Sequence, residues 1–256
     1  MRSIWKGAIS FGLVIIPVAL FSATEDKKPK FKMLRAEDGS PIKYKRVAEV
    51  DGKEVTWDEI VRGFEVEKDR YAIFTDEELD ELRVGGGSRL IDVVQFVDSA
   101  EIDPVFYRTS YYLAPESSGE KAYTILLEAL TSKNRVGIAR FSLRAKEHLA
   151  TLRADDDVLV LETMFWPDEI RAPEFEHASV DVRPEEVQMA EMIIDNLTSA
   201  FDPDAFRDQT REAVEAAARA KLEGEEVVSP SMPEPTKVLD LLEALKASVE
   251  ATKRAS

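Results

Sequence analysis

The chain opens with Met1-Arg2-Ser3-Ile4-Trp5-Lys6-Gly7-Ala8-Ile9-Ser10-Phe11-Gly12-Leu13-Val14-Ile15-Ile16-Pro17-Val18-Ala19-Leu20-Phe21-Ser22-Ala23, its most informative stretch. Within it Ile9, Phe11 and Leu13 alternate with smaller residues, which is the period of a half-buried strand. Val14-Ile15-Ile16 continues the apolar run to Pro17, where we expect the strand to enter a turn. The chain is therefore predicted to begin with β-structure.

The same stretch imitates a secretory signal, because two basic residues precede the apolar residues 8–20. Ser10, Gly12 and Pro17 interrupt that run, however, and Phe21 is too bulky for a cleavage site. No run is long enough to cross a bilayer. Cysteine is absent and there are only 2 histidines, which disfavours disulfides, thiolate zinc sites and cysteine nucleophiles. We expect a soluble cytoplasmic protein with no membrane partner, and much catalytic chemistry is already disfavoured.

The formal charge of −16 argues against nucleic acid at first sight, since affinity for DNA depends on cations that meet phosphates. The distribution of charge reverses that impression. Residues 27–46 carry a net charge of +6 and residues 131–153 carry +5, whereas residues 155–229 carry −15. A basic surface with acidic surroundings can still attract a polyanion, although each basic run alone could be only a solvated face.

Further strands are predicted at residues 42–50, 90–97, 136–144 and 157–164, and one helix at residues 121–130. The strand at 42–50 lies between Asp38-Gly39 and Asp51-Gly52, which are turn residues. In the strand at 136–144, Val136, Ile138 and either Phe141 or Leu143 are expected inward. Arg140, Ser142 and Arg144 then remain on the other face.

After Arg183 the pattern becomes helical. Pro184 suits a first turn, and apolar residues recur at helical spacing to Leu197. A second helix is predicted with Asp202 as its N-cap and Pro203 as its first residue, ending at Gly224. Residues 225–236 form a Pro-rich linker, and residues 237–256 an amphipathic helix with the apolar stripe Val238, Leu241, Leu242, Leu245 and Val249. The stripe could pack on its own domain, but the tether favours a partner's groove.

Several ordered motifs resemble those of the bacterial Ku family: Ile4-Trp5-Lys6-Gly7, Ile9-Ser10-Phe11-Gly12-Leu13-Val14, Ala36-Glu37-Asp38-Gly39, Tyr44-Lys45-Arg46-Val47, Ser110-Tyr111-Tyr112-Leu113-Ala114-Pro115, 143–153, 166–171 and Phe201-Asp202-Pro203. The resemblance implies an α+β fold, with a small β-barrel core and a bridge that encircles DNA (1–182), a helical arm (183–224), the linker (225–236) and a partner-docking helix (237–256). It implies a ring-shaped homodimer that binds double-stranded DNA ends of any sequence in non-homologous end joining and is associated with the nucleoid. The dimer would recruit and stimulate an ATP-dependent DNA ligase. The resemblance further implies that the protein is not itself an enzyme and has no cofactor and no metal.

Two departures from the family pattern matter. Many members have a Cys-x-x-Cys pair where this chain has Ala48 and Asp51, so no metal or redox role is expected there. The chain also ends at Lys253-Arg254-Ala255-Ser256, without the long lysine-rich tail of some members. DNA binding by such a tail is therefore not expected.

The resemblance also implies which cations meet the phosphates, with Arg144 as the strongest candidate. The bridge would supply Lys30, Lys32, Arg35, Lys43, Lys45 and Arg46, and the barrel Arg108, Arg135, Arg140, Arg144 and Lys146. About a third of these eleven are expected to make no contact. His148, Trp5 and Tyr111 are interpreted as packed structural residues.

Two other functions remain open from the residues alone. A metal-dependent nuclease could bind Mg²⁺ through Asp155-Asp156-Asp157 and Glu162. Three adjacent carboxylates are more typical of a polar turn between strands, because neighbours in sequence point to different sides. An acidic protein-interaction scaffold would explain the net charge and the last helix, but it gives the two basic clusters no role.

Overall fold

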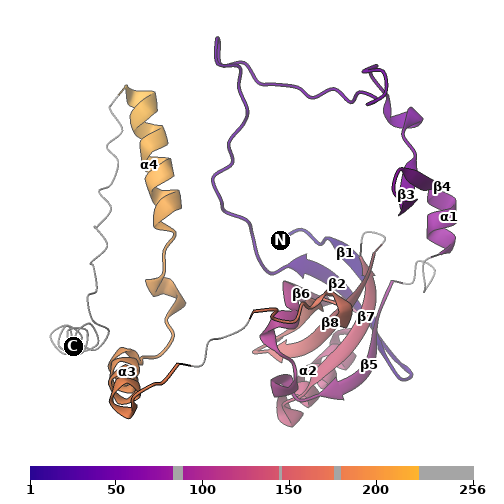
Figure 1. Cartoon of the computed structure of the whole chain (residues 1–256). Helices are drawn as coiled ribbons and strands as arrows, with labels where there is room; N and C mark the ends of the chain where they lie inside the picture. Colours follow the sequence, from indigo (N-terminus) through magenta and orange to yellow (C-terminus); the bar gives the residue numbers. More distant parts are fainter. Residues whose placement is uncertain (83–88, 144–145, 176–179, 225–256) are drawn as a thin grey trace. The chain divides into compact units, whose positions relative to one another are not determined.

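The computed structural model describes residues 1–82, 89–143, 146–175 and 180–224. The chain separates into two compact units, residues 1–26 with 33–173 and residues 27–32 with 174–256. Strands predominate in the first unit and helices in the second (Figure 1). The predicted α+β class is confirmed.

The first unit is built on a closed barrel of seven strands, whose order is β1-β2-β6-β9-β8-β7-β5. All neighbours are antiparallel except β1 and β5, which close the barrel in parallel. The strands are β1 (Trp5–Phe11), β2 (Val14–Ser22), β5 (Leu90–Val97), β6 (Tyr107–Pro115), β7 (Val136–Leu143), β8 (Lys146–Asp155) and β9 (Val158–Met164). The strands predicted at 90–97, 136–144 and 157–164 are confirmed, apart from residue 144, which is not described.

The first turn was predicted in the wrong place. The chain turns at Gly12 and Leu13, where Gly12 has a φ of +58° and Leu13 is fully exposed. Pro17 instead lies inside β2, opposite Ala8 of β1. The N–H of Ala8 donates to the Arg89 oxygen on the far side of β1, so the nitrogen of Pro17 points away from β1. Pairing with β6 starts only at Val18, so Pro17 removes no ladder bond.

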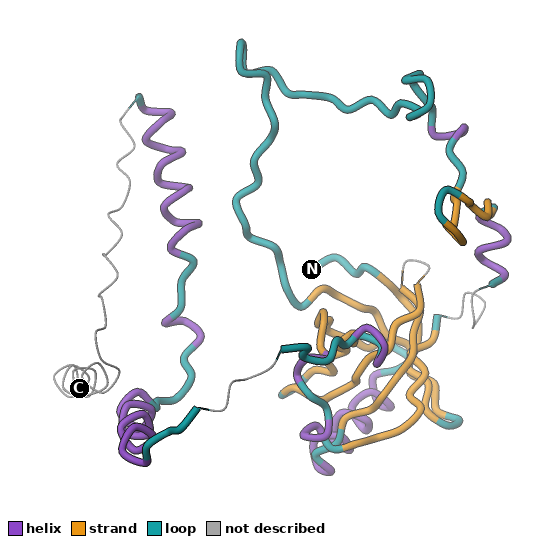
Figure 2. The backbone as a smooth tube through the Cα atoms, viewed as in Figure 1, coloured by secondary structure: helices purple, strands orange, loops and turns teal. Residues whose placement is uncertain are grey.

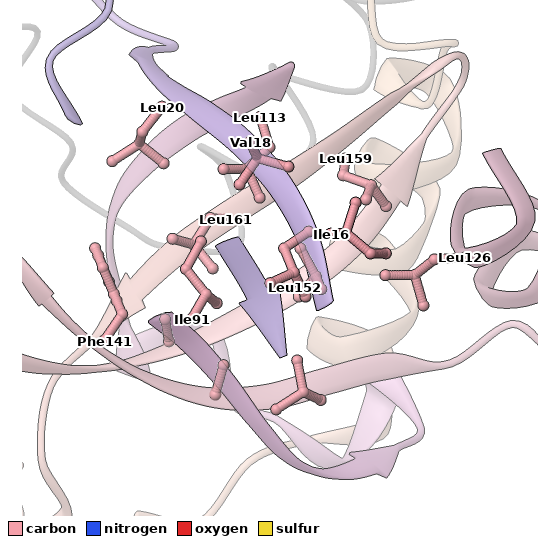
Figure 3. Close-up of a cluster of buried hydrophobic side chains, with 14 of the residues drawn as sticks. Ile16, Val18, Leu20, Ile91, Leu113, Leu126, Phe141, Leu152, Leu159 and Leu161 are labelled. Atoms are coloured by element: carbon pink, nitrogen blue, oxygen red, sulfur yellow. The ribbon is translucent and has the colours of Figure 1, made fainter. Parts of the chain in front are cut away.

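The barrel is filled by aliphatic side chains from all its strands (Figure 3). Ile16, Leu113 and Leu161 are fully buried there. On β7 the interior takes Ala139, Phe141 and Leu143, whereas Ile138 is only partly buried, so its predicted inward placement is wrong. The residues that line the interior alternate with Arg140 and Ser142, as a continuous register with β8 requires.

The helix α2 (Glu120–Lys133), predicted at 121–130, contacts β8 and β2 and adds Tyr123, Leu126 and Leu130 to the core. The Tyr123 hydroxyl donates to the Leu113 oxygen at 2.7 Å and accepts from the Leu159 N–H at 2.7 Å. Burial raises the pKa of this phenol. The hydroxyl therefore links α2 to β6 and β9 inside the core.

The predicted strand at 42–50 is wrong. Residues 33–56 form a loop with two tight turns (Figure 2), at Gly39 and Gly52, whose φ angles are +69° and +68°. Only two isolated bridges occur there, Leu34 with Pro41 and Val47 with Glu54. The turn residues were predicted correctly, but the segment joins neither of the two sheets, and the closed barrel offers it no free edge.

Residues 57–82 form small elements of the first unit. These are η1 (Trp57–Glu59), the hairpin β3 (Arg62–Glu67) and β4 (Arg70–Phe74), and α1 (Asp76–Glu81). Three further one-turn helices occur: η2 (Ser99–Glu101) and η3 (Pro104–Phe106) between β5 and β6, and η4 (Pro167–Glu169) after β9.

The second unit contains α3 (Pro184–Leu197), η5 (Pro203–Ala205) and α4 (Gln209–Glu223). Asp202 caps only the short turn η5, accepting from the Asp204 N–H at 3.0 Å, so its predicted role at the second helix is wrong. That helix is α4, and Asp208 caps it by accepting from the Arg211 N–H at 3.0 Å. Gly224 ends α4 with a φ of +80°, as predicted. The linker and the amphipathic segment at 225–256 lie outside the described residues.

Candidate nucleic-acid interface

The described part of the barrel places two predicted cations at one end of the sheet. Met164 of β9 pairs with Tyr107 of β6 on one side and with Leu149 of β8 on the other. This register brings Arg108 of β6 close to the start of β8, where Lys146 lies. Both side chains are exposed, and the Arg108 guanidinium lies 5.1 Å from the centroid of the Phe165 ring.

The pKa of His148 is affected by both Arg108 and Lys146. Its pKa is lowered mainly by burial and then by the positive charges of Lys146 and Arg108, while the Leu143 backbone and Glu169 oppose the shift. The imidazole packs on Phe141, with ring centroids 5.6 Å apart. His148 is therefore a packed residue close to two surface cations, which agrees with its structural interpretation.

Arg140 lies at the middle of β7 and is exposed. Its cross-strand neighbours are Leu149 of β8 and Asp92 of β5. Within the described residues, no carboxylate forms an ion pair with Arg140, Arg108 or Lys146. These three cations are available to an external anion. Arg144, the strongest candidate from the sequence, lies outside the described residues.

Arg135 is not brought to the same end. It precedes β7, whereas Lys146 begins β8 and pairs with Leu143 at the far end of β7, so a strand of 8 residues separates the two cations. That length corresponds to about 26 Å. Arg135 instead donates to Asp98 at 2.6 Å, and the pKa of this carboxyl is lowered first by the Ala100 N–H and then by Arg135. Its charge is thus partly satisfied within the chain.

The bridge cations differ in how far they are already engaged. Arg35 pairs with Asp38, lowering the pKa of that carboxyl well below its usual range, and Lys45 pairs with Glu54 at 2.6 Å. The Arg46 guanidinium lies 3.7 Å from the centroid of the Trp57 ring. Among the described residues Lys30, Lys32 and Lys43 are exposed and have no ion-pair partner, although Lys30 and Lys32 belong to the second unit.

Trp57 was not singled out from the sequence. It lies eleven positions beyond Arg46, and only the turn at Gly52 brings the two together. Alternation of aromatic residues with Lys and Arg, at Lys43-Tyr44-Lys45-Arg46, was the available signal. By contrast Trp5 and Tyr111 pack against the barrel core, as predicted, with the Trp5 ring edge-on to Phe141.

The acidic residues considered for a metal site have structural roles. Asp155-Asp156-Asp157 forms the turn between β8 and β9, with Asp156 at a φ of +47°. Glu162 accepts from the Arg153 guanidinium at 3.0 Å and from the Ser110 hydroxyl at 3.2 Å. In the part of the chain that is described, no group of three or more His, Cys, Asp or Glu could hold a metal ion. The structure therefore gives the nuclease hypothesis no support.

A surface cavity of about 690 Å³ opens beside the same acidic turn. Apolar side chains, including Phe21 and Tyr112, line it together with the three aspartates. Carboxylates repel a polyanion, so this cavity is unsuited to the DNA backbone. None of the described helices is both long and apolar enough to span a membrane.

Comparison with known sequences agrees with the barrel. The family model described as "Ku70/Ku80 beta-barrel domain" matches residues 10–189. Three relatives called "Non-homologous end joining protein Ku" align over 99% of this chain. The protein of Frankia casuarinae is 45% identical, that of Heliobacterium modesticaldum 45% and that of Bacillus subtilis 41%. The alignment covers 64% of the Frankia protein, just under two thirds of its length, and 93% and 83% of the other two. The closed barrel, the family match and this identity together show that the chain belongs to the Ku family of non-homologous end joining proteins.

Proposed function

We propose that this protein binds double-stranded DNA ends of any sequence in non-homologous end joining. The observation that carries the proposal is the set of exposed barrel cations, Arg108, Arg140 and Lys146, which no carboxylate pairs within the described residues. Contacts of Lys and Arg with phosphate fix a protein on a duplex without reading its sequence. Such contacts suit a protein that must hold any broken end, and they require no catalytic group.

The binding form we propose is a ring-shaped homodimer. Apolar side chains of the single chain that remain in water support it: Phe64 and Ile73 on the β3–β4 hairpin, and Ile194 and Leu197 on α3, are 64–67% exposed. An isolated two-stranded hairpin is only marginally stable in water. A second copy of the chain would cover such surfaces, because larger exposed apolar areas mark interaction sites.

Recruitment of an ATP-dependent DNA ligase is the further part of the proposal. It rests on the amphipathic pattern of residues 237–256 and on the family resemblance. A helix with a single apolar face must bury that face, and a Pro-rich tether lets it reach a separate partner.

Binding to linear and to covalently closed circular duplex of the same sequence tests the ring. A closed ring can load only at an end, so the affinity for linear DNA should greatly exceed that for the circle. The affinity should also fall steeply with salt, because each phosphate contact releases counterions. Equal binding to both forms would exclude the ring, a pronounced base preference would exclude sequence-independent binding, and degradation of the DNA with Mg²⁺ would favour a nuclease.

A further inference from the structure

Two aromatic side chains of the bridge, Tyr44 and Trp57, remain outside the core. Tyr44 is 75% exposed and Trp57 is 69% exposed. Aromatic rings of this size stabilise a protein strongly when they are buried. Their exposure in a DNA-repair protein therefore indicates that they contact something outside the chain. Both lie in the segment that also carries Lys43, Lys45 and Arg46.

The local backbone holds Trp57 against a cation. The turn at Gly52 pairs the two sides of a small hairpin, with the Ala48 N–H donating to the Lys53 oxygen at 2.8 Å and the Val55 N–H donating to the Arg46 oxygen at 2.9 Å. Arg46 therefore lies beside the residues that lead into η1. Its guanidinium carbon is 3.7 Å from the centroid of the Trp57 ring, which is a cation–π contact.

The cations beside the rings are only partly engaged. Lys45 pairs with Glu54 at 2.6 Å, but within the described residues Lys43 and Arg46 have no carboxylate at ion-pair distance. The Glu59 carboxylate, close to Trp57 in sequence, accepts from the Thr56 N–H and from the Thr56 hydroxyl, each at 2.9 Å. The Glu59 carboxylate is thus held by Thr56, the N-cap of η1. Two cations without a carboxylate partner among the described residues thus occur in the segment that carries the exposed rings.

We propose that Tyr44 and Trp57 stack on the unpaired bases of a single-stranded overhang, while Lys43 and Arg46 contact its phosphates. Stacking of aromatic side chains on bases, combined with a cationic track for the backbone, is how single strands are bound without sequence preference. An intact duplex has no bases splayed out for these rings. The two rings would therefore contact a part of the DNA other than the duplex, although the inference rests on the proposed binding of DNA ends.

The experiment compares one duplex, closed by a hairpin at its far end, with a blunt or a 3′-overhanging near end. An oligo-dT overhang of about ten nucleotides lies within the site sizes known for single-strand binders. Full-length protein should bind the overhanging duplex more tightly than the blunt one. Trp57→Ala should weaken overhang binding about tenfold, since one lost stacking contact has that effect, and should leave blunt-end affinity unchanged.

Two variants make the comparison specific. Trp57→Phe keeps a ring and should retain most of the overhang preference. Phe206→Ala removes an aromatic side chain of similar exposure, 73%, in the second unit, and should retain all of it. Light scattering on each variant measures the mass of the assembly.

The outcomes separate this inference from the function it rests on. If the wild-type protein binds blunt and overhanging duplex equally, or if Trp57→Ala keeps the preference, the stacking site is wrong while end binding stands. If Trp57→Ala lowers the assembly mass and blunt-end affinity together, the ring belongs to a protein interface instead. Failure of the wild type to bind either duplex would overturn the proposed function itself.

Discussion

Arg108 on β6 and Lys146 on β8 carry the duplex contact that we propose. Both are exposed, and both lie near enough to His148 to lower its pKa. Arg108→Glu with Lys146→Glu should therefore weaken binding to linear duplex. Each lost phosphate contact should also reduce the salt slope by about one. Fluorescence anisotropy at rising salt measures both quantities.

The matched control for this pair reverses two cations on α4 of the second unit, Arg211→Glu with Arg219→Glu. The same change of charge at a surface without the barrel cluster should leave the affinity and the slope nearly unchanged. Equal loss in both double variants would mean that net charge, and not the barrel cluster, governs binding.

His148 gives a prediction for stability. Its pKa is lowered in the folded state, mainly by burial, from a usual value of 6.5. Between the folded and unfolded pKa values the unfolded chain binds more protons, so the free energy of unfolding falls as the pH drops below 6.5. His148→Phe, which keeps a ring against Phe141, should reduce this pH dependence. Urea unfolding on both sides of that pH measures it, and an unchanged pH dependence would contradict the assignment.

At the scale of elements, closure of the barrel depends on the short parallel pairing of β1 with β5, which joins Ala8, Ile9 and Ser10 to Leu90, Ile91 and Asp92. Gly7 lies next to this seam. A Cβ atom there would lie 2.1 Å from the Trp5 ring and 2.2 Å from the Arg89 oxygen. Gly7→Ala should therefore lower the free energy of unfolding by about 1–3 kcal/mol.

Urea denaturation of the full chain measures that effect, and Gly12→Asn provides its control. Gly12 has a φ of +58° and open space around it, and Asn tolerates this conformation better than most residues. The control should change stability little. A Gly7→Ala variant as stable as the control would show that the seam between β1 and β5 can yield.

The sequence predicted those elements whose pattern is decided by burial. Ile91 and Val93 of β5 and Leu159 and Leu161 of β9 are apolar because they are buried in the barrel, and residues 121–130 have the periodicity of the helix that covers it. Prediction failed where the local pattern had no tertiary partner: residues 42–50 alternate like a strand but meet no edge. Asp202-Pro203 is a good helix start that produces only the single turn η5, and α4 starts separately with Asp208 as its N-cap.

The candidate site was predicted less completely than the fold. Residue type and family resemblance indicated the cations, but only the register of β6, β9 and β8 brings Arg108 near Lys146, and only strand length separates Arg135 from them. Pairing across space, such as Arg135 with Asp98, has no signature in a single sequence. The contact of Arg46 with Trp57 was missed for the same reason.

At the scale of the whole molecule, the net charge of −16 is distributed unevenly along the chain. The segment from Asp155 to Ser229 carries most of the negative excess, while residues 27–46 and 131–153 are the two basic clusters. The acidic part is expected to repel DNA, so binding should be confined to the basic surfaces. In this scheme residues 237–256 are not needed for DNA binding and are free for another partner.

Deletion of residues 237–256 should therefore leave dimerisation and linear-duplex binding close to the wild type and abolish stimulation of the ligase. Leu242→Asp with Leu245→Asp should have the same effect, because an unpaired carboxylate in an apolar groove costs several kcal/mol, about a thousandfold in affinity. Ala247→Asp with Ala251→Asp adds the same charge away from the apolar stripe and should retain recruitment. Pull-down of the ligase measures its recruitment by all three variants. A truncated chain that still recruits ligase but loses solubility or DNA binding would mean that the stripe packs on its own fold.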